Sequence, residues 1–93
     1  MTELTQNAQE TLLEFPCQFP LKIMGLASAE LLPTIAKIVC KHAADFDPQT
    51  IQTRASKAGN YTSLTCTINA VSKAQLDDLY RELSSHPLVK FAL

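Results

Sequence analysis

The chain has 93 residues, a mass of 10.2 kDa and a formal net charge of −1, with 46% hydrophobic and 18% charged residues. This length allows one compact domain, and the composition excludes collagen-like, low-complexity and charge-rich disordered chains. A net charge near zero argues against a protein that attracts nucleic acid or an acidic membrane through its bulk charge.

The charge is unevenly divided along the chain. Residues 1–16 contain Glu3, Glu10 and Glu14 but neither Lys nor Arg, so they carry −3 and the remaining residues carry +2. Residues 1–12 show no sustained hydrophobic period, which predicts a flexible acidic tail ahead of a single domain at 13–93. The chain starts without a basic region and a long apolar run, so we expect a cytoplasmic protein with no signal peptide and no membrane span.

The three cysteines, Cys17, Cys40 and Cys66, lie more than twenty residues apart from one another. No Cys-x-x-Cys pair is present, so the sequence predicts neither a zinc site nor a thioredoxin-like redox motif. We expect these residues to be reduced and to act as small apolar side chains.

Residues 17–25 predict a first strand, because apolar side chains alternate there with Lys22 and Met24. Pro20 lacks an N–H group, which favours an edge position or an unpaired part of this strand. The inward row is Phe19, Leu21 and Ile23.

An amphipathic helix follows, with Ser28 as its expected cap, a start at 29–32 and an end at 42–44. Its apolar stripe is Leu31, Ile35, Ile38, Val39 and Ala43. The connector 45–48 ends at a proline, and we expect Phe46 to fold back onto the last helical turn.

Two further strands are predicted at 50–55 and 61–71, where polar and apolar residues alternate again. The segment 56–60 between them contains Gly59, which tolerates the positive φ angle of a tight hairpin turn. The polar row of the longer strand is Ser63, Thr65, Thr67 and Asn69.

Ser72 and Gln75 have the spacing of a capping box, in which each residue satisfies a free backbone N–H of the other. An apolar stripe over 76–83 predicts a second helix, and Pro87 separates it from a last strand at 88–93. The inward row of that strand is Val89, Phe91 and Leu93.

The order of these elements is strand, helix, strand, strand, helix, strand. Two strand–helix–strand units with right-handed crossovers, joined by a hairpin, give a four-stranded antiparallel sheet with both helices on one face. The predicted fold is therefore an α+β, ferredoxin-like βαββαβ sandwich with strand order 4-1-3-2.

The landmarks of the chain occur together and in order over about residues 12–93. They are LEFP at 13–16, FPLKIMG at 19–25, HA at 42–43, SKAGNY at 56–61, SLTCTINA at 63–70, LYREL at 79–83 and HPLVKFAL at 86–93. In this set the chain resembles the YbeD-like family of small, functionally uncharacterised bacterial proteins. The resemblance implies a ferredoxin-like fold and a likeness in shape to the ACT regulatory modules of amino-acid enzymes. It implies no catalytic residues.

Few residues suit catalysis. Cys40 and His42 are two positions apart on a helix and point in different directions, so they do not form a nucleophile–base pair. We expect His42 to stand against the helix dipole and His86 to belong to a turn. Asp45 and Asp47 supply too few oxygens for a hard cation, which takes about six or more. The sequence predicts no enzyme, no metal site and no cofactor.

The sheet face without helices is the most informative surface. The candidate binding residues on it are Lys22, Arg54, Thr65, Thr67 and Lys90. Lys and Arg supply charge-assisted hydrogen bonds to carboxylate or phosphate, while a plain solvated sheet face is the simplest alternative. The exposed edge strands would also allow self-association as a homodimer.

We therefore expect a non-enzymatic regulatory or binding module, which either senses a metabolite in the manner of ACT modules or docks a protein partner. The alternative is a nucleic-acid-binding module that uses the same face. RNA-binding proteins of this fold stack bases on aromatic side chains of the two central strands, and the outward rows of those strands contain none here.

Overall fold

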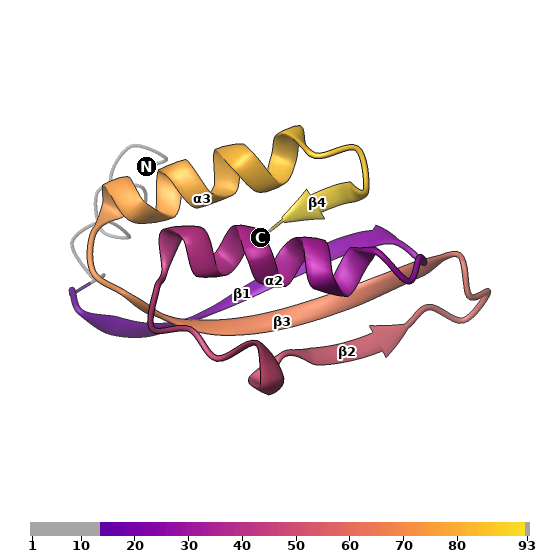
Figure 1. Ribbon diagram of the computed structural model, residues 1–93, viewed down its shortest axis with the longest axis horizontal. Coiled ribbons are helices and arrows are strands. Elements are labelled where there is room, and N and C mark those ends of the chain that lie inside the picture. The colour runs from indigo at the N-terminus through magenta and orange to yellow at the C-terminus, as the bar shows by residue number, and fades with distance from the viewer. Residues whose placement is uncertain (1–13, 93) are drawn as a thin grey trace, which may run out of the picture.

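The computed structural model describes residues 14–92 (Figure 1). Its elements are β1 (Cys17–Leu26), α2 (Leu31–His42), the 3₁₀ turn η1 (Pro48–Thr50), β2 (Gln52–Ala55), β3 (Tyr61–Ala70), α3 (Lys73–Ser85) and β4 (Val89–Ala92). All strand pairs are antiparallel and the strand order is β2-β3-β1-β4, which confirms the predicted α+β topology. The predicted N-terminal tail and Leu93 lie outside the described residues.

The long central pair, β1 and β3, decides which side chains face the helices. Their register runs without interruption over ten residue pairs, from Cys17 opposite Ala70 to Leu26 opposite Tyr61. Successive side chains of a strand point to opposite faces, so each strand contributes one inward row. The inward residues Leu21, Ile23, Leu64, Cys66, Ile68 and Ala70 are buried.

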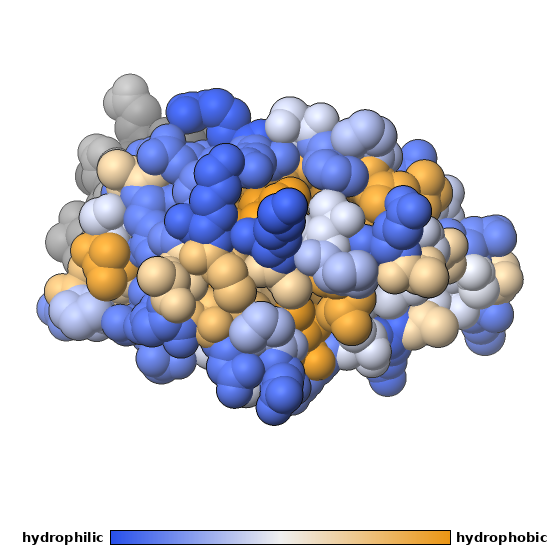
Figure 2. Space-filling view, in the orientation of Figure 1, coloured by the Kyte–Doolittle hydropathy of each residue, from blue (hydrophilic) through white to orange (hydrophobic). Residues whose placement is uncertain are grey.

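The two helices lie side by side over this row and complete the core (Figure 1). The predicted stripe of α2 is buried throughout, and α3 adds Leu76, Leu79 and Leu83. Phe46 folds back into the same core, as expected. In the view of Figure 2, hydrophilic residues cover most of the outer surface of α3. No helix within residues 14–92 is long and apolar enough to cross a membrane.

Helix α2 begins at Leu31 and ends at His42, within the predicted ranges, but its cap differs from the expectation. Ser28 Oγ accepts a hydrogen bond from the Glu30 N–H at 3.1 Å, and Glu30 is the N-cap residue, with no hydrogen bond from its side chain to the helix. A tight turn closed by the Leu31 N–H and the Ser28 carbonyl precedes the helix. Ser28 therefore stabilises this turn and does not cap the helix.

The second strand is shorter than predicted, because residues 48–50 form the turn η1. Asp47 Oδ1 accepts from the Gln49 N–H at 3.0 Å and caps this turn, and the Thr50 hydroxyl donates to the Asp47 carbonyl at 2.7 Å. These local bonds hold Thr50 in the turn, so β2 begins only at Gln52.

The capping box of α3 is present in an altered form. Ser72 Oγ accepts from the Gln75 N–H at 3.1 Å, as predicted. The Gln75 side chain accepts from the N–H of Val71 at 2.7 Å instead of that of Ser72, and its amide donates to the His42 carbonyl at 2.9 Å. One side chain thus ties the start of α3 to the end of α2.

The predicted inward position of Phe91 is wrong, because β4 contains a bulge. Val89 lies opposite Gly25, while Phe91 lies opposite Met24, so Lys90 is an extra residue on the β4 side. The bulge breaks the alternation that the sequence suggested. Phe91 is 48% exposed on the face away from the helices, whereas Val89 is buried and Ala92 packs against the core.

Pro20 lies in the part of β1 that β4 does not reach. It is opposite Thr67 of β3, and among the described residues β4 pairs only with residues 23–25. Because the Leu26 N–H donates to Leu88 on the β4 side at 2.9 Å, the even-numbered positions of β1 face that side. The absence of an N–H at Pro20 therefore costs no hydrogen bond between strands. This agrees with the predicted unpaired position of Pro20.

Gly25 gives a test of the packing between β1, α2 and the segment before β4. A Cβ atom there would lie 2.6 Å from the Leu88 carbonyl oxygen and 2.6 Å from Leu31 Cδ1. We expect Gly25→Ala to lower the free energy of unfolding in urea by about 1–3 kcal/mol.

The matched control is Gly59→Asn. Gly59 has φ +79° and no atom within 4 Å of an added Cβ, and Asn tolerates this backbone region, so the expected loss is below about 1 kcal/mol. Equal losses for the two variants would show that close approach at Gly25 is not what the fold requires.

Candidate functional site

The sheet face turned away from the helices, here called the open face, carries charge of one sign. In the four strands of the described residues, the charged side chains are Lys22, Arg54 and Lys90, and Asp and Glu are absent. The carboxylates within residues 14–92 all lie in loops, caps and helices. The open face is therefore basic although the whole chain is close to neutral.

Part of the open face forms a hollow of about 320 Å³, open to solvent on one side and here called the basic hollow. It is lined by Lys22, Gln52, Thr53, Arg54, Ser63 and Thr65. The sheet register explains why they meet. Thr65 of β3 lies between Gln52 and Lys22 in one row, and Ser63 lies beside Arg54 in the next.

The side chains of the basic hollow are suited to holding an anion. Lys22 offers an ammonium group, Arg54 offers a planar guanidinium fork, and Ser63 and Thr65 offer hydroxyl groups. Within residues 14–92 neither Lys22 nor Arg54 forms an ion pair, so no carboxylate of this part of the chain neutralises them. The residues that line the hollow include no imidazole, thiol or carboxylate.

The five residues predicted for this face are not all in one place. Lys22, Arg54 and Thr65 line the basic hollow. Thr67 lies opposite Pro20, one row further along β3 and outside the lining. Lys90 is on β4, the edge strand opposite β2, and its Nζ stands 5.9 Å from the centre of the Tyr61 ring.

An apolar strip adjoins the basic hollow and was missed by sequence reasoning. Met24 lies between Ser63 and Phe91 in one row, and Leu26 lies opposite Tyr61 in the next. Leu26 is 38% exposed, comparable with the 48% of Phe91. Only the bulge in β4 turns Phe91 to this face, and the sequence carries no clear signal for that bulge.

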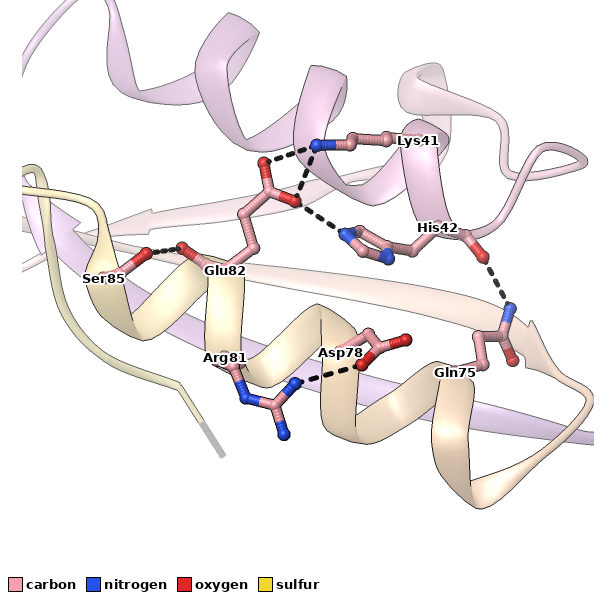
Figure 3. Close-up of polar contacts among 7 residues, drawn as sticks. All are labelled: Lys41, His42, Gln75, Asp78, Arg81, Glu82 and Ser85. Carbon is pink, nitrogen blue, oxygen red and sulfur yellow. Dashed lines mark hydrogen bonds and ion pairs between the residues drawn. The ribbon is translucent and has the colours of Figure 1, made fainter.

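A second polar cluster lies between the helices, on the other side of the sheet (Figure 3). His42 Nε2 lies 2.7 Å from Glu82 Oε1, and Lys41 Nζ lies 3.2 Å from the same oxygen. A carboxylate only accepts hydrogen bonds, so the His42 ring donates through Nε2. Glu82 and His42 are 33% and 18% exposed, and the cluster joins α2 to α3.

Two side-chain hydrogen bonds stabilise the charged form of the Glu82 carboxylate. The hydrogen bonds from His42 and from Lys41 hold the pKa of Glu82 below its ordinary value. Sequence reasoning placed His42 at the helix end but gave no partner, because forty residues separate it from Glu82.

Two other reactive side chains, those of His86 and Cys66, lie in a turn and in the core. His86 Nδ1 accepts from the Leu88 N–H at 3.1 Å and so belongs to the turn before β4, as predicted. Burial raises the pKa of the Cys66 thiol to about 12, with the nearby Cys40 adding to the shift, which keeps Cys66 protonated at neutral pH. Within residues 14–92, no three His, Cys, Asp or Glu side chains gather as a metal site would require.

The Glu82 cluster predicts a specific dependence of stability on pH. Folding lowers the pKa of Glu82, so the charged carboxylate stabilises the native state above its ordinary pKa of 4.5, and this contribution is lost as the pH falls through the folded pKa. We expect Glu82→Gln to lower the urea midpoint at pH 7, with a difference from the parent chain that shrinks steadily below pH 4.5.

Asp45→Asn is the matched control, because Asp45 is an exposed carboxylate in the connector and its side chain forms no ion pair within residues 14–92. A pH-independent loss in Glu82→Gln, or the same acid limb in Asp45→Asn, would contradict the assigned role of the cluster.

The comparison with known proteins places the chain in a family. A family model described as a protein of unknown function, DUF493, matches residues 10–93. The UPF0250 protein of Janthinobacterium sp. (strain Marseille) is 50% identical over 93 residues, covering 100% of both chains. Those of Paraburkholderia phytofirmans and Nitrosomonas europaea are each 47% identical, over 94% and 91% of this chain and 98% of theirs. The chain therefore belongs to the DUF493 family, as its resemblance to the YbeD-like proteins predicted.

Proposed function

We propose that this chain is a non-enzymatic binding module that holds the carboxylate or phosphate group of a ligand in the basic hollow. One observation carries the proposal. The two strands that flank β3 bring Lys22 and Arg54 to one hollow with the hydroxyl groups of Ser63 and Thr65, in a sheet whose four described strands contain no carboxylate. An anion would replace solvent as the partner of both cations.

Charge-assisted hydrogen bonds are shorter and stronger than neutral ones, and Arg54 can engage two oxygens of one anion at once. The hollow is open to solvent, so salt screens its field over about 10 Å at 0.1 M ionic strength. Binding should therefore be reversible and sensitive to salt, as suits a sensor of ligand concentration.

A regulatory role agrees with this arrangement. The likeness to ACT modules suggests a domain that responds to a small ligand and passes the response to another protein. The side chains that could serve catalysis are engaged elsewhere, since His42 bonds to Glu82 and His86 closes a turn. The three cysteines are free thiols, as is usual in the reducing cytoplasm that we propose as the compartment.

Nucleic-acid binding is the second candidate. Phe91, which the sequence predicted to face inward, adds an aromatic side chain to the open face and so favours this candidate. Phe91 and Tyr61 add two aromatic rings to one end of a basic open face. Base stacking in RNA-binding domains of this fold uses rings on the two central strands. Phe91 is on the edge strand β4 and Tyr61 is the first residue of β3, so the anion-binding proposal remains preferred.

A thermal-shift screen tests the proposal. The ligands are inorganic phosphate, citrate, amino acids, short-chain carboxylic acids, nucleotides and a short single-stranded RNA, each at low and at physiological salt. We expect at least one small anion to raise the melting temperature, with a smaller rise at the higher salt. Lys22→Glu and Arg54→Glu should each weaken that response at least tenfold in apparent affinity.

Lys37→Glu is the matched control, because Lys37 is an exposed lysine of α2 and lies outside the basic hollow. It should keep the full response. No response to any small anion, or equal losses in all three variants, would overturn the proposal. Binding of the RNA alone, with an affinity that falls steeply with salt, would favour the second candidate.

A further inference from the structure

The outer edge of β2 is open beside the basic hollow. All four residues of β2 are exposed, and β3 is the strand paired with β2 within residues 14–92. The Ser56 N–H donates to the Tyr61 carbonyl at 2.9 Å, so the alternation of an antiparallel ladder turns Gln52 and Arg54 toward β3. The N–H and C=O groups of Thr53 and Ala55 therefore face outward.

Both the backbone and the side chains of β2 are placed to receive an added strand at this edge. Gln52 and Arg54 point their side chains to the open face, opposite Thr65 and Ser63. A strand added to β2 would place every second side chain on that face, next to Arg54 and the mouth of the hollow. The opposite edge of the sheet is less suitable, since it consists of the four-residue, bulged strand β4 and of the part of β1 beyond it, where Pro20 offers no N–H.

We propose that an extended acidic segment of a partner protein adds to β2 as an antiparallel fifth strand, with carboxylates at alternate positions and one of them beside Arg54, at the mouth of the basic hollow. The inference rests on the proposed function, because Arg54 is also one of the two cations of the basic hollow. The backbone of the partner segment forms hydrogen bonds with the backbone of β2, and the charges of its side chains determine which segments bind.

The positive charge beside β2 favours an acidic partner over a second copy of this chain. Pairing β2 with its own copy would bring a second Arg54 and a second basic hollow to the same junction. Like charges that face each other across strands destabilise the pair. An acidic segment instead brings an opposite charge to Arg54, in a sheet whose four described strands lack carboxylates.

The probe is a labelled seven-residue peptide with glutamate at alternate positions and threonine between, measured by fluorescence anisotropy at low salt. A peptide with glutamine in place of glutamate is the control for charge. We expect saturable binding of the acidic peptide that weakens with salt, and at least tenfold weaker binding of the glutamine peptide. Arg54→Gln should lose at least tenfold, and Lys37→Gln should change the affinity less than about twofold.

Methylation of peptide nitrogens tests the added strand without altering the protein. In the proposed antiparallel pairing, the threonine N–H groups face β2 and the glutamate N–H groups point away. Methylation at the threonine positions should weaken binding at least tenfold, and methylation at the glutamate positions less than about twofold. Thr53→Pro, which removes an outward N–H of β2, should show the same loss if its circular dichroism spectrum is unchanged.

The outcomes separate this inference from the proposed function. If inorganic phosphate or citrate binds and the acidic peptide does not, the partner is wrong and the basic hollow remains an anion site. Equal effects of methylation at the two sets of positions would overturn strand addition. If neither small anions nor the peptide bind, both the inference and the proposed function are overturned.

Discussion

The ten-residue antiparallel pairing of β1 with β3 is the constraint on which the rest of the molecule depends. It fixes two rows of side chains at once, because neighbouring residues of a strand face opposite ways. One row, which includes Leu21 and Leu64, forms the floor of the core. The other row brings Lys22 beside Thr65. A slip of one residue would expose the core row and bury the lysine, so burial of the core enforces the geometry of the basic hollow.

The helix layer and the open face differ in whether their charged side chains have partners within the protein. On the helix side, Glu82 is held by His42 and Lys41, and Gln75 ties the two helices through the His42 carbonyl. These bonds satisfy carboxylate and backbone groups within the protein. On the open face, Lys22 and Arg54 have no such partner within residues 14–92. The same fold thus neutralises one polar cluster and leaves another available to a ligand.

The spacing of apolar residues along the chain predicted the helices, the strands, the strand order and three residues of the basic hollow. It did so because the period of the apolar residues in a strand or a helix shows which of its faces is buried. The parts that were wrong depend on contacts that a local pattern does not contain. The bulge at Lys90 turns Phe91 outward, and the pair of His42 with Glu82 joins residues forty positions apart. Ser28 was assigned to the helix because its own turn, closed by Leu31, has the same sequence signature as a cap.

The central claim is that the open face, and not the helix layer, binds anions. Amide chemical shifts in nitrogen–proton correlation spectra, recorded during titration with inorganic phosphate, locate the contact directly. The account predicts saturable shifts concentrated at Lys22, Arg54, Ser63 and Thr65, which lie on three strands but in one hollow. Shifts confined to the helices, spread evenly over the surface or absent at saturating phosphate would contradict it.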